Sequence, residues 1–173
     1  MNMIVKSGIA AAMLAGAASP AFGQATSSVT TPGTTTIIQP VTIAQDSALA
    51  FGTIIRPTSG TSTISIGTGA DTVTASGSGV ALRGPTSRAR YTVTGEGGQT
   101  VSVTMPASFD LSKAGASALA VTLTRTPAGN LTLSNALGTA GTASLDIGGS
   151  FVIDSTTATG AYTGSFTVSV AYN

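Results

Sequence analysis

The stretch that most constrains this fold is the final one, residues 160–173, where large apolar side chains recur at every second position. A period of two is that of a β-strand, whose side chains point alternately to opposite faces. A regular strand must pair along its length or leave a row of unpaired amides and carbonyls. We therefore expect a β-sheet in this region. One face of the strand carries Tyr162, Phe166, Val168, Val170 and Tyr172, and Gly164 interrupts this row.

The first 23 residues differ in character from the rest. Lys6 is followed by a short run rich in Ala, Met and Leu over residues 8–18, and then by Pro20 and small residues around Gly23. This order is typical of a secretory signal peptide, and the run has about half of the roughly twenty apolar residues that a membrane-spanning helix needs. We therefore expect residues 1–23 to be removed and the protein to be exported, with no transmembrane segment in the mature chain.

Charged and metal-binding side chains are scarce. Of the seven basic residues Lys6 falls in the predicted signal peptide, which leaves six against six acidic ones, and there is no cysteine or histidine. Such a balance gives no general field for binding nucleic acid. The lack of His and Cys removes the usual general base, the thiolate nucleophile and the best transition-metal ligands. We predict that the protein is not an enzyme, uses no cofactor or metal and binds no nucleic acid.

Two groups of charged residues have a functional and a structural interpretation. A glycosidase needs two carboxylates at a fixed spacing, and Asp110, Asp146 and Asp154 are the candidates; each stands beside turn residues, where aspartate is common, so we interpret them as solvated turns. Residues 83–90 hold three arginines, which would suit an anionic glycan or a partner. We favour the interpretation that they keep a loop and a strand edge soluble.

Short alternating strands with glycine and proline turns follow Pro40. Turn residues predict hairpin-type reversals at residues 96–98 and 127–130, and another at Gly148 and Gly149, and residues 109–119 are the one segment where a helical turn is considered. Strands spaced by about eight to twelve residues, without an amphipathic helix, indicate an all-β sandwich. Expected strand residues fall at 41–43, 49–55, 63–66, around 73, 80–82, 88–94, 101–105, 121–124, 131–133, 143–147 and 150–153.

Between the signal peptide and the first strand lies a segment rich in Thr and Ser, residues 24–39, with Pro32 and Gly33 in it and few large apolar side chains before Ile37. Alone, such a segment forms an extended arm. Its threonines favour β-structure once a template is offered. We therefore divide the chain into a signal peptide (1–23), an N-terminal arm (24–39) and a β-sandwich domain (40–173).

Four segments in order carry a resemblance to a known family: residues 41–54, residues 88–95, the pair Gly148 and Gly149, and residues 160–172. Together they resemble the proteobacterial secreted family known as domain of unknown function 4402. The likeness spans about residues 38–173. The family name itself implies no activity.

The final stretch is also similar to that of pilus subunits of the chaperone-usher type. These subunits end in an alternating strand with a penultimate Tyr and a Gly fourteen positions from the end, the places of Tyr172 and Gly160 here. The resemblance implies an immunoglobulin-like sandwich that lacks one strand, with a groove beside its final strand. A periplasmic chaperone fills this groove first, and the arm of the next subunit then replaces it by β-strand addition.

The resemblance thus assigns partner-binding roles on both sides of a self-association. The groove residues would be Gly160, Tyr162, Phe166, Val168, Val170 and Tyr172, and the donor arm would present Val29, Thr31, Gly33, Thr35 and Ile37. The implied function is a non-catalytic subunit of a fimbria or similar polymer, located in the periplasm, at the cell surface or in the extracellular fimbria. The alternative is a monomeric surface or periplasmic binding module for a glycan or protein, because a self-complete sandwich explains the same alternation.

Overall fold

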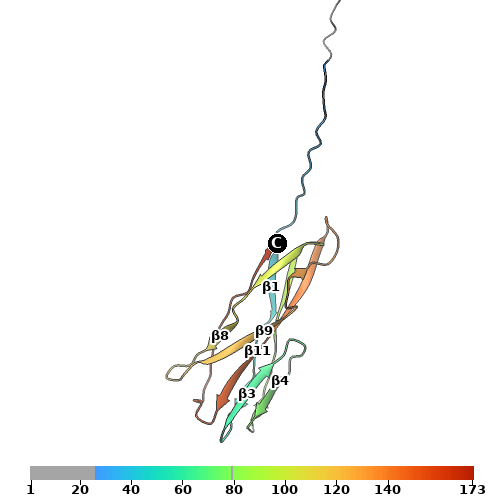
Figure 1. Ribbon diagram of the computed structural model, residues 1–173. Coiled ribbons are helices and arrows are strands. Elements are labelled where there is room, and N and C mark those ends of the chain that lie inside the picture. The colour runs from blue at the N-terminus through green and yellow to red at the C-terminus, as the bar shows by residue number, and fades with distance from the viewer. Residues whose placement is uncertain (1–25, 79) are drawn as a thin grey trace, which may run out of the picture. The chain divides into compact units, whose positions relative to one another are not determined.

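The computed structural model describes residues 26–78 and 80–173, of which residues 36–173 form one compact unit (Figure 1). The predicted signal peptide lies outside the described residues. No residue in the described ranges is helical, which confirms the all-β prediction. The strands are β1 (Thr42–Ser47), β2 (Thr53–Ile55), β3 (Thr61–Ile66), β4 (Val73–Gly77), β5 (Ala81–Arg83), β6 (Ala89–Glu96), β7 (Thr100–Thr104), β8 (Ser108–Leu111), β9 (Leu119–Thr126), β10 (Leu131–Thr132), β11 (Ala140–Asp154) and β12 (Ser169–Tyr172).

The larger sheet is built around β11, which has 15 residues. On one edge β11 pairs first with β6, over residues 140–147, and then with β3, over residues 149–154. On the other edge residues 146–150 pair with β9. β1 continues the sheet beyond β6, β4 continues it beyond β3, and β8 continues it beyond β9. All of these pairings are antiparallel.

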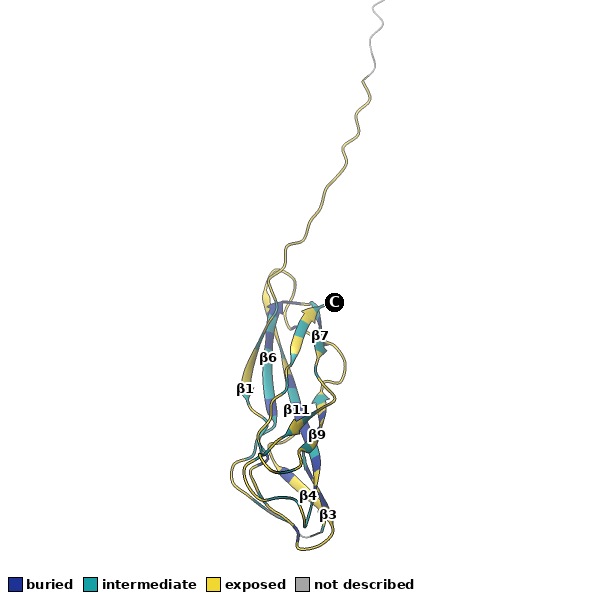
Figure 2. Cartoon of the chain, turned by 90° about the vertical axis from the view of Figure 1, so that its left-hand side faces the viewer, coloured by how far each residue is buried: buried dark blue, intermediate teal, exposed yellow. Residues whose placement is uncertain are grey.

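A smaller sheet has the order β10-β7-β12, and β2 and β5 form a separate ribbon. The curled sheets pack in a sandwich-like arrangement. The alternation of β3 shows why the core forms, because Ser62, Ile64 and Ile66 are buried while their neighbours Thr61 and Thr63 are exposed. Burial is concentrated on β6 and β11, whereas β1 is largely exposed (Figure 2). Core side chains come from both sheets and include Val93, Val101, Val121, Leu131, Leu145, Ile147 and Phe151.

The hairpins predicted at residues 96–98 and 127–130 are wrong. The chain does turn at both places, but β6 belongs to the larger sheet and β7 to the smaller one, and β9 and β10 are divided in the same way. Each turn therefore carries the chain across the sandwich. A turn sequence specifies that the chain bends, and the partner of the next strand depends on burial by the rest of the fold.

The hairpin predicted at Gly148 and Gly149 is also wrong, because β11 runs through both residues without turning. A Cβ on Gly148 would overlap the carbonyl oxygen of Ile66, and one on Gly149 would lie 2.9 Å from Cγ1 of Val121. The pair stands where β11 changes its neighbour from β6 to β3. The two glycines are thus needed for close approach of other strands, and not for a turn.

Residues 109–119 contain no helical turn. Phe109 and Leu111 belong to β8, which pairs with β9 in a hairpin, with Phe109 opposite Val121 and Leu111 opposite Leu119. Both side chains are half-buried against the core. Phe109 and Leu111 thus point to the same face of a strand, with Asp110 on the other.

Candidate functional site

The final strand, β12, is an end strand of the smaller sheet. Ser169 lies opposite Thr104 of β7, and Tyr172 lies opposite Val101. No second strand in the described part of the chain pairs with β12. One of its two edges is therefore unpaired, a feature that the alternation of the sequence leaves open.

The direction of the backbone groups identifies the residues on this unpaired edge. The N–H of Asn173 donates to the carbonyl oxygen of Thr100 on the β7 side, at 3.1 Å. Backbone groups of successive residues in an antiparallel ladder point to opposite sides, so Ala171 and Ser169 also face β7. The amides and carbonyls of Val170 and Tyr172 then face away from β7 and form the free edge.

The side chains beside the free edge are apolar and only half-buried. Phe166, Val168, Val170 and Tyr172 pack against the core, yet each retains some exposure. β1 is an end strand of the larger sheet and contacts β12, and its Ile43 is half-buried too. Two end strands, one from each sheet, thus lie together with incompletely covered apolar side chains.

The strand predicted over residues 160–173 is shorter in the structure, and this is a correction. β7 ends at Thr104, just before Pro106, so residues before Ser169 have no partner there. The upstream segment turns to β8 instead: Thr163 and Ser112 exchange two backbone hydrogen bonds of 2.8 and 3.0 Å.

Two predicted groove residues therefore lie away from β12. Gly160 is exposed, has a φ of 131° and stands against the side chain of Lys113. The hydroxyl of Tyr162 donates locally to the carbonyl oxygen of Ala158 at 3.0 Å. Phe166 packs on Phe109 of β8, with ring centroids 5.0 Å apart. The structure thus brings Val168, Val170 and Tyr172 together and separates Gly160 and Tyr162 from them.

The predicted arm has no strand partner in the described residues. Residues 26–40 form no regular secondary structure, and all of them are exposed. Val29 is 90% exposed and Ile37 is 89% exposed. Thr31, Gly33 and Thr35 are exposed between them. Val29 and Ile37 therefore bury almost none of their side-chain surface among the described residues, whereas Ile38, next to the domain, is 39% exposed.

A buried acid, Glu96, holds the point where the arm joins the domain. Glu96 is 2% exposed, and its carboxylate accepts the N–H of Gln39 at 3.2 Å and the N–H of Gly138. The Tyr172 hydroxyl accepts the N–H of Glu96 and donates to the carbonyl oxygen of Gln39, both at 2.7 Å. We call Gln39, Glu96, Gly138 and Tyr172 the arm-root clamp.

Sequence reasoning placed Glu96 in a turn and missed its burial. One signal was present: Glu96 stands between Gly95 and Gly97, and glycines around a lone acid allow close approach of backbone to its carboxylate. A Cβ on Gly95 would overlap the Tyr172 hydroxyl, and one on Gly97 would lie 2.6 Å from the carbonyl oxygens of Ala136 and Thr139. The clamp is therefore packed too tightly for side chains at either position.

The three candidate carboxylates lie on different elements. Asp110 is exposed on β8 and Asp146 lies within β11, so the turn interpretation is wrong for both. Asp154 does begin a turn, and hydrogen bonds from the side chain and backbone of Thr156, and from Thr157, lower the pKa of its carboxyl. No hydrogen bond or ion pair within residues 26–78 and 80–173 joins these three acids.

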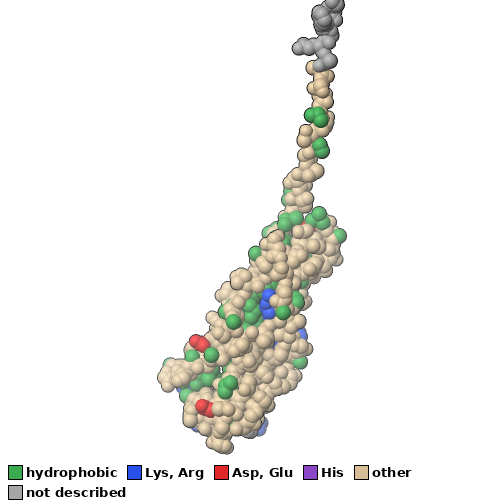
Figure 3. Space-filling model, in the orientation of Figure 1, with side chains coloured by type: hydrophobic (Ala, Val, Ile, Leu, Met, Phe, Trp, Pro, Cys, Tyr) green, Lys and Arg blue, Asp and Glu red, His purple; other side chains and the backbone are tan. Residues whose placement is uncertain are grey.

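Two of the three arginines in the predicted cluster, Arg88 and Arg90, form ion pairs with aspartates. Arg88 Nε lies 2.9 Å from Asp146 Oδ1, and an Arg88 terminal nitrogen lies 3.2 Å from Asp71. Arg90 lies 3.3 Å from Asp71 and 3.5 Å from Asp146. The network joins the loop before β4 to β6 and β11. Few charged side chains appear on the face seen in Figure 3.

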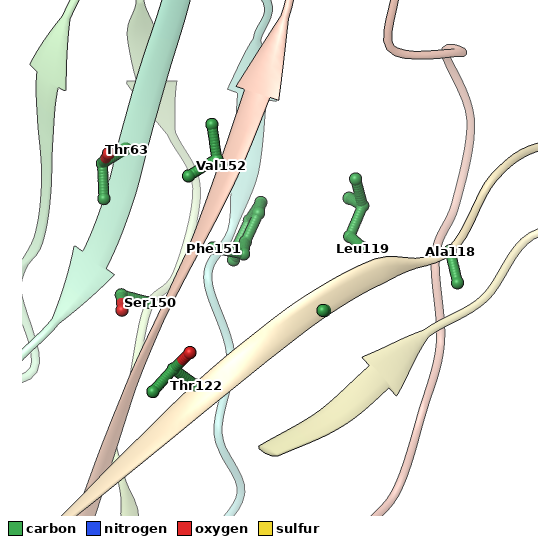
Figure 4. Close-up of a pocket in the computed structure, with 8 residues that line it drawn as sticks. Thr63, Ala118, Leu119, Thr122, Ser150, Phe151 and Val152 are labelled. Carbon is green, nitrogen blue, oxygen red and sulfur yellow. The ribbon is translucent and has the colours of Figure 1, made fainter. Parts of the chain in front are cut away.

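Two shallow hollows accompany these features. One, of about 350 Å³, opens where β9 diverges from β11, with Leu119, Phe151 and Val152 on its walls (Figure 4). The other, of about 470 Å³, lies over the ion-pair network and includes Asp46, Tyr91 and Ser144. Burial raises the pKa of the Tyr91 hydroxyl, so this group remains a neutral hydrogen-bond donor.

Two further properties concern membranes and metals. Among the residues that the structure describes, no helix is long and apolar enough to cross a membrane. Nor do three acidic side chains gather there in a group able to hold a metal ion.

Fold and site together define a class: an all-β, sandwich-like domain whose last strand has a free edge. The family model described as "Domain of unknown function (DUF4402)" matches residues 41–172. The chain belongs to this family, as the segments around residues 41–54, 88–95 and 160–172 predict. The comparison with curated proteins found no match, and neither did the comparison with solved structures.

Proposed function

We propose that this protein is a non-catalytic, exported subunit of a fimbria or similar surface polymer, assembled by β-strand donation. The observation that carries the proposal is the free edge of β12, where Val170 and Tyr172 direct backbone groups away from β7. An unpaired edge beside half-covered apolar side chains is a template for a guest strand. This strand would complete an immunoglobulin-like sandwich.

The guest strand is the arm of a second copy. The arm has the composition of a strand without a template, and none of its described residues lies in a strand or β-bridge. Laid along β12, Val29, Thr31, Gly33, Thr35 and Ile37 would face the apolar row while main-chain bonds supply affinity. Before assembly a periplasmic chaperone would cover the same edge and prevent premature pairing.

Removing the arm tests donation directly. We expect the mature protein to form fibres in electron micrographs and a version without residues 24–38 to remain monomeric, because the guest strand is missing. Equal assembly of the two proteins would contradict the proposal. A folded arm-less protein, checked by circular dichroism, excludes misfolding as the cause.

Two substitutions at one position test the acceptor edge. Val170→Pro removes an N–H that faces the guest and leaves the β7 ladder intact, whereas Val170→Ala removes comparable side-chain packing and keeps the amide. We expect fibres from the alanine variant and none from the proline variant. If both assemble alike, the β12 edge is not the acceptor.

A second candidate is a monomeric glycan-binding module, which the hollow over Asp46, Arg88, Arg90 and Tyr91 favours. Its polar lining suits sugar hydroxyls, which both donate and accept hydrogen bonds. Such a module would bind glycans on an array as an arm-less monomer, and Tyr91→Phe would weaken that binding. Fibre formation that depends on the arm distinguishes the first candidate from this one.

A further inference from the structure

We infer that the arm-root clamp directs the arm to a second copy of this chain by preventing it from closing onto its own β12. This inference rests on the proposed function, since it concerns the same acceptor edge. In a subunit with both an acceptor edge and a matching arm, the arm can pair with its own β12 or with β12 of another copy. Closure within one chain would always win at low concentration, because linked segments meet at a high effective concentration.

The strand directions show what closure within one chain requires. β1 is antiparallel to β6, β6 ends at the turn that leads into β7, and β12 is antiparallel to β7. β12 therefore runs toward the arm root and β1 runs away from it. An arm lying on its own β12 would have to approach the root alongside β12 and then reverse into β1 within a few residues.

The local sequence permits such a reversal. Residues 39–42 place Pro40 at the second position of a four-residue turn, where proline is favoured. In that turn the carbonyl oxygen of Gln39 would face the amide of Thr42. Proline alone thus provides no barrier to closure.

The clamp supplies the barrier, because it holds both backbone groups of Gln39. The N–H of Gln39 is bound by the buried carboxylate of Glu96, and its carbonyl oxygen accepts the Tyr172 hydroxyl. With Gln39 held in this orientation, Ile37 is 89% exposed, and residues 36–39 form no strand pairing with β12. Closure would need to break these bonds, one of which involves a charged group in a buried site.

The two modes of pairing can be counted with a cross-linker. The chain has no cysteine, so Thr34→Cys and Ala171→Cys provide the only two thiols. Ala171 is exposed on the outer face of β12, and Thr34 stands on the arm face opposite to the predicted apolar row. A short bismaleimide then gives a bridged monomer when the arm closes on its own strand and a ladder of oligomers when it pairs with another copy.

The test compares two tyrosine variants of this full chain. Tyr172→Phe removes the hydroxyl that binds Gln39, and the matched control Tyr162→Phe removes a hydroxyl bound only to Ala158. We expect the control to give a ladder, and Tyr172→Phe to raise the ratio of bridged monomer to ladder about tenfold, the factor that one net hydrogen bond makes in an equilibrium. Glu96→Gln provides a second variant should Tyr172→Phe fail to fold.

The outcomes separate the two proposals. Equal ratios in Tyr172→Phe and Tyr162→Phe would overturn the role of the clamp and leave strand donation standing. If neither variant gave a bridged monomer or a ladder, the arm would not reach β12 of its own chain or of another copy, and both proposals would then fall.

Discussion

Alanine at Gly148 should destabilise the domain by about 2 kcal/mol. The new Cβ would overlap the carbonyl oxygen of Ile66 and lie 2.9 Å from the carbonyl carbon of Gly67. Both atoms belong to the backbone at the end of β3, beside the pairing of Gly149 with Ile66, and neither can swing aside as a long side chain would. Overpacking costs about 1–3 kcal/mol, and a clash with fixed backbone atoms belongs at the upper end, near about 3 kcal/mol. Removing a glycine from a strand recovers about 0.5–1 kcal/mol, which leaves a net loss of about 2 kcal/mol.

The assay is thermal and urea unfolding followed by circular dichroism. For a domain of this size a loss of about 2 kcal/mol lowers the Tm by about 6–8 °C. The matched control is Gly129→Ala, because a Cβ there meets no atom within 4 Å and the φ of Gly129 is not positive. We expect the control to stay within about 0.5 kcal/mol of the unchanged protein.

A third variant separates close approach from a turn. Asparagine is favoured in two-residue hairpin turns, so Gly148→Asn would be milder than Gly148→Ala if residues 148 and 149 formed one. Against the β3 backbone its larger side chain should be the more harmful of the two. A Tm of Gly148→Ala equal to that of Gly129→Ala would refute close approach at residue 148, and so would a higher Tm for Gly148→Asn than for Gly148→Ala.

Two other expectations concern charged groups. Hydrogen bonds from Thr156 lower the pKa of Asp154 in the folded protein, so the stability that this turn contributes is present above the unfolded pKa of about 3.9 and is lost as the pH falls through the folded pKa. Carboxyl carbon NMR should show Asp154 titrating below about 3.9, and Thr156→Ala should raise this pKa. A titration midpoint that does not move in Thr156→Ala would contradict this cause. Arg88→Ala should lower the free energy of unfolding by about 1–2 kcal/mol, because the Arg88 side chain is only 12% exposed and its loss leaves Asp146 poorly paired. Arg90→Ala should lower it by at most about 0.5 kcal/mol, because the Arg90 side chain is 43% exposed. Urea titrations measure both losses, and equal losses would show that burial does not set the strength of these ion pairs.

The fold class was accessible from the sequence because a period of two survives in single strands. Val101 stands between Thr100 and Ser102, Val121 is followed by Thr122, and both valines are fully buried. The pairing of the strands was harder to predict, because glycine and proline indicate where the chain bends but not which strand the next strand pairs with. The same residue type that turns the chain elsewhere allows β11 to pass straight through Gly148, a choice that depends on Ile66, 82 residues earlier.

The candidate site was predicted in part for a similar reason. Val168, Val170 and Tyr172 were recognisable as one face, yet the end of β7 at Thr104 shortens the strand that carries them. Glu96 was not recognisable as a buried group, since its partners Gln39 and Gly138 are backbone amides 57 and 42 residues away. Almost any residue type can supply a backbone amide, so the sequence does not show which residues bind Glu96.

The central position of β11 also sets an order of events during folding. Its partners β3, β6 and β9 all precede it in the chain and do not pair with one another, so the larger sheet has no middle until residues 140–154 are available. A ribosome must therefore release most of this chain before the larger sheet can close. Pairing over such sequence separations is slow, which gives the chain a long interval as an unfolded polymer.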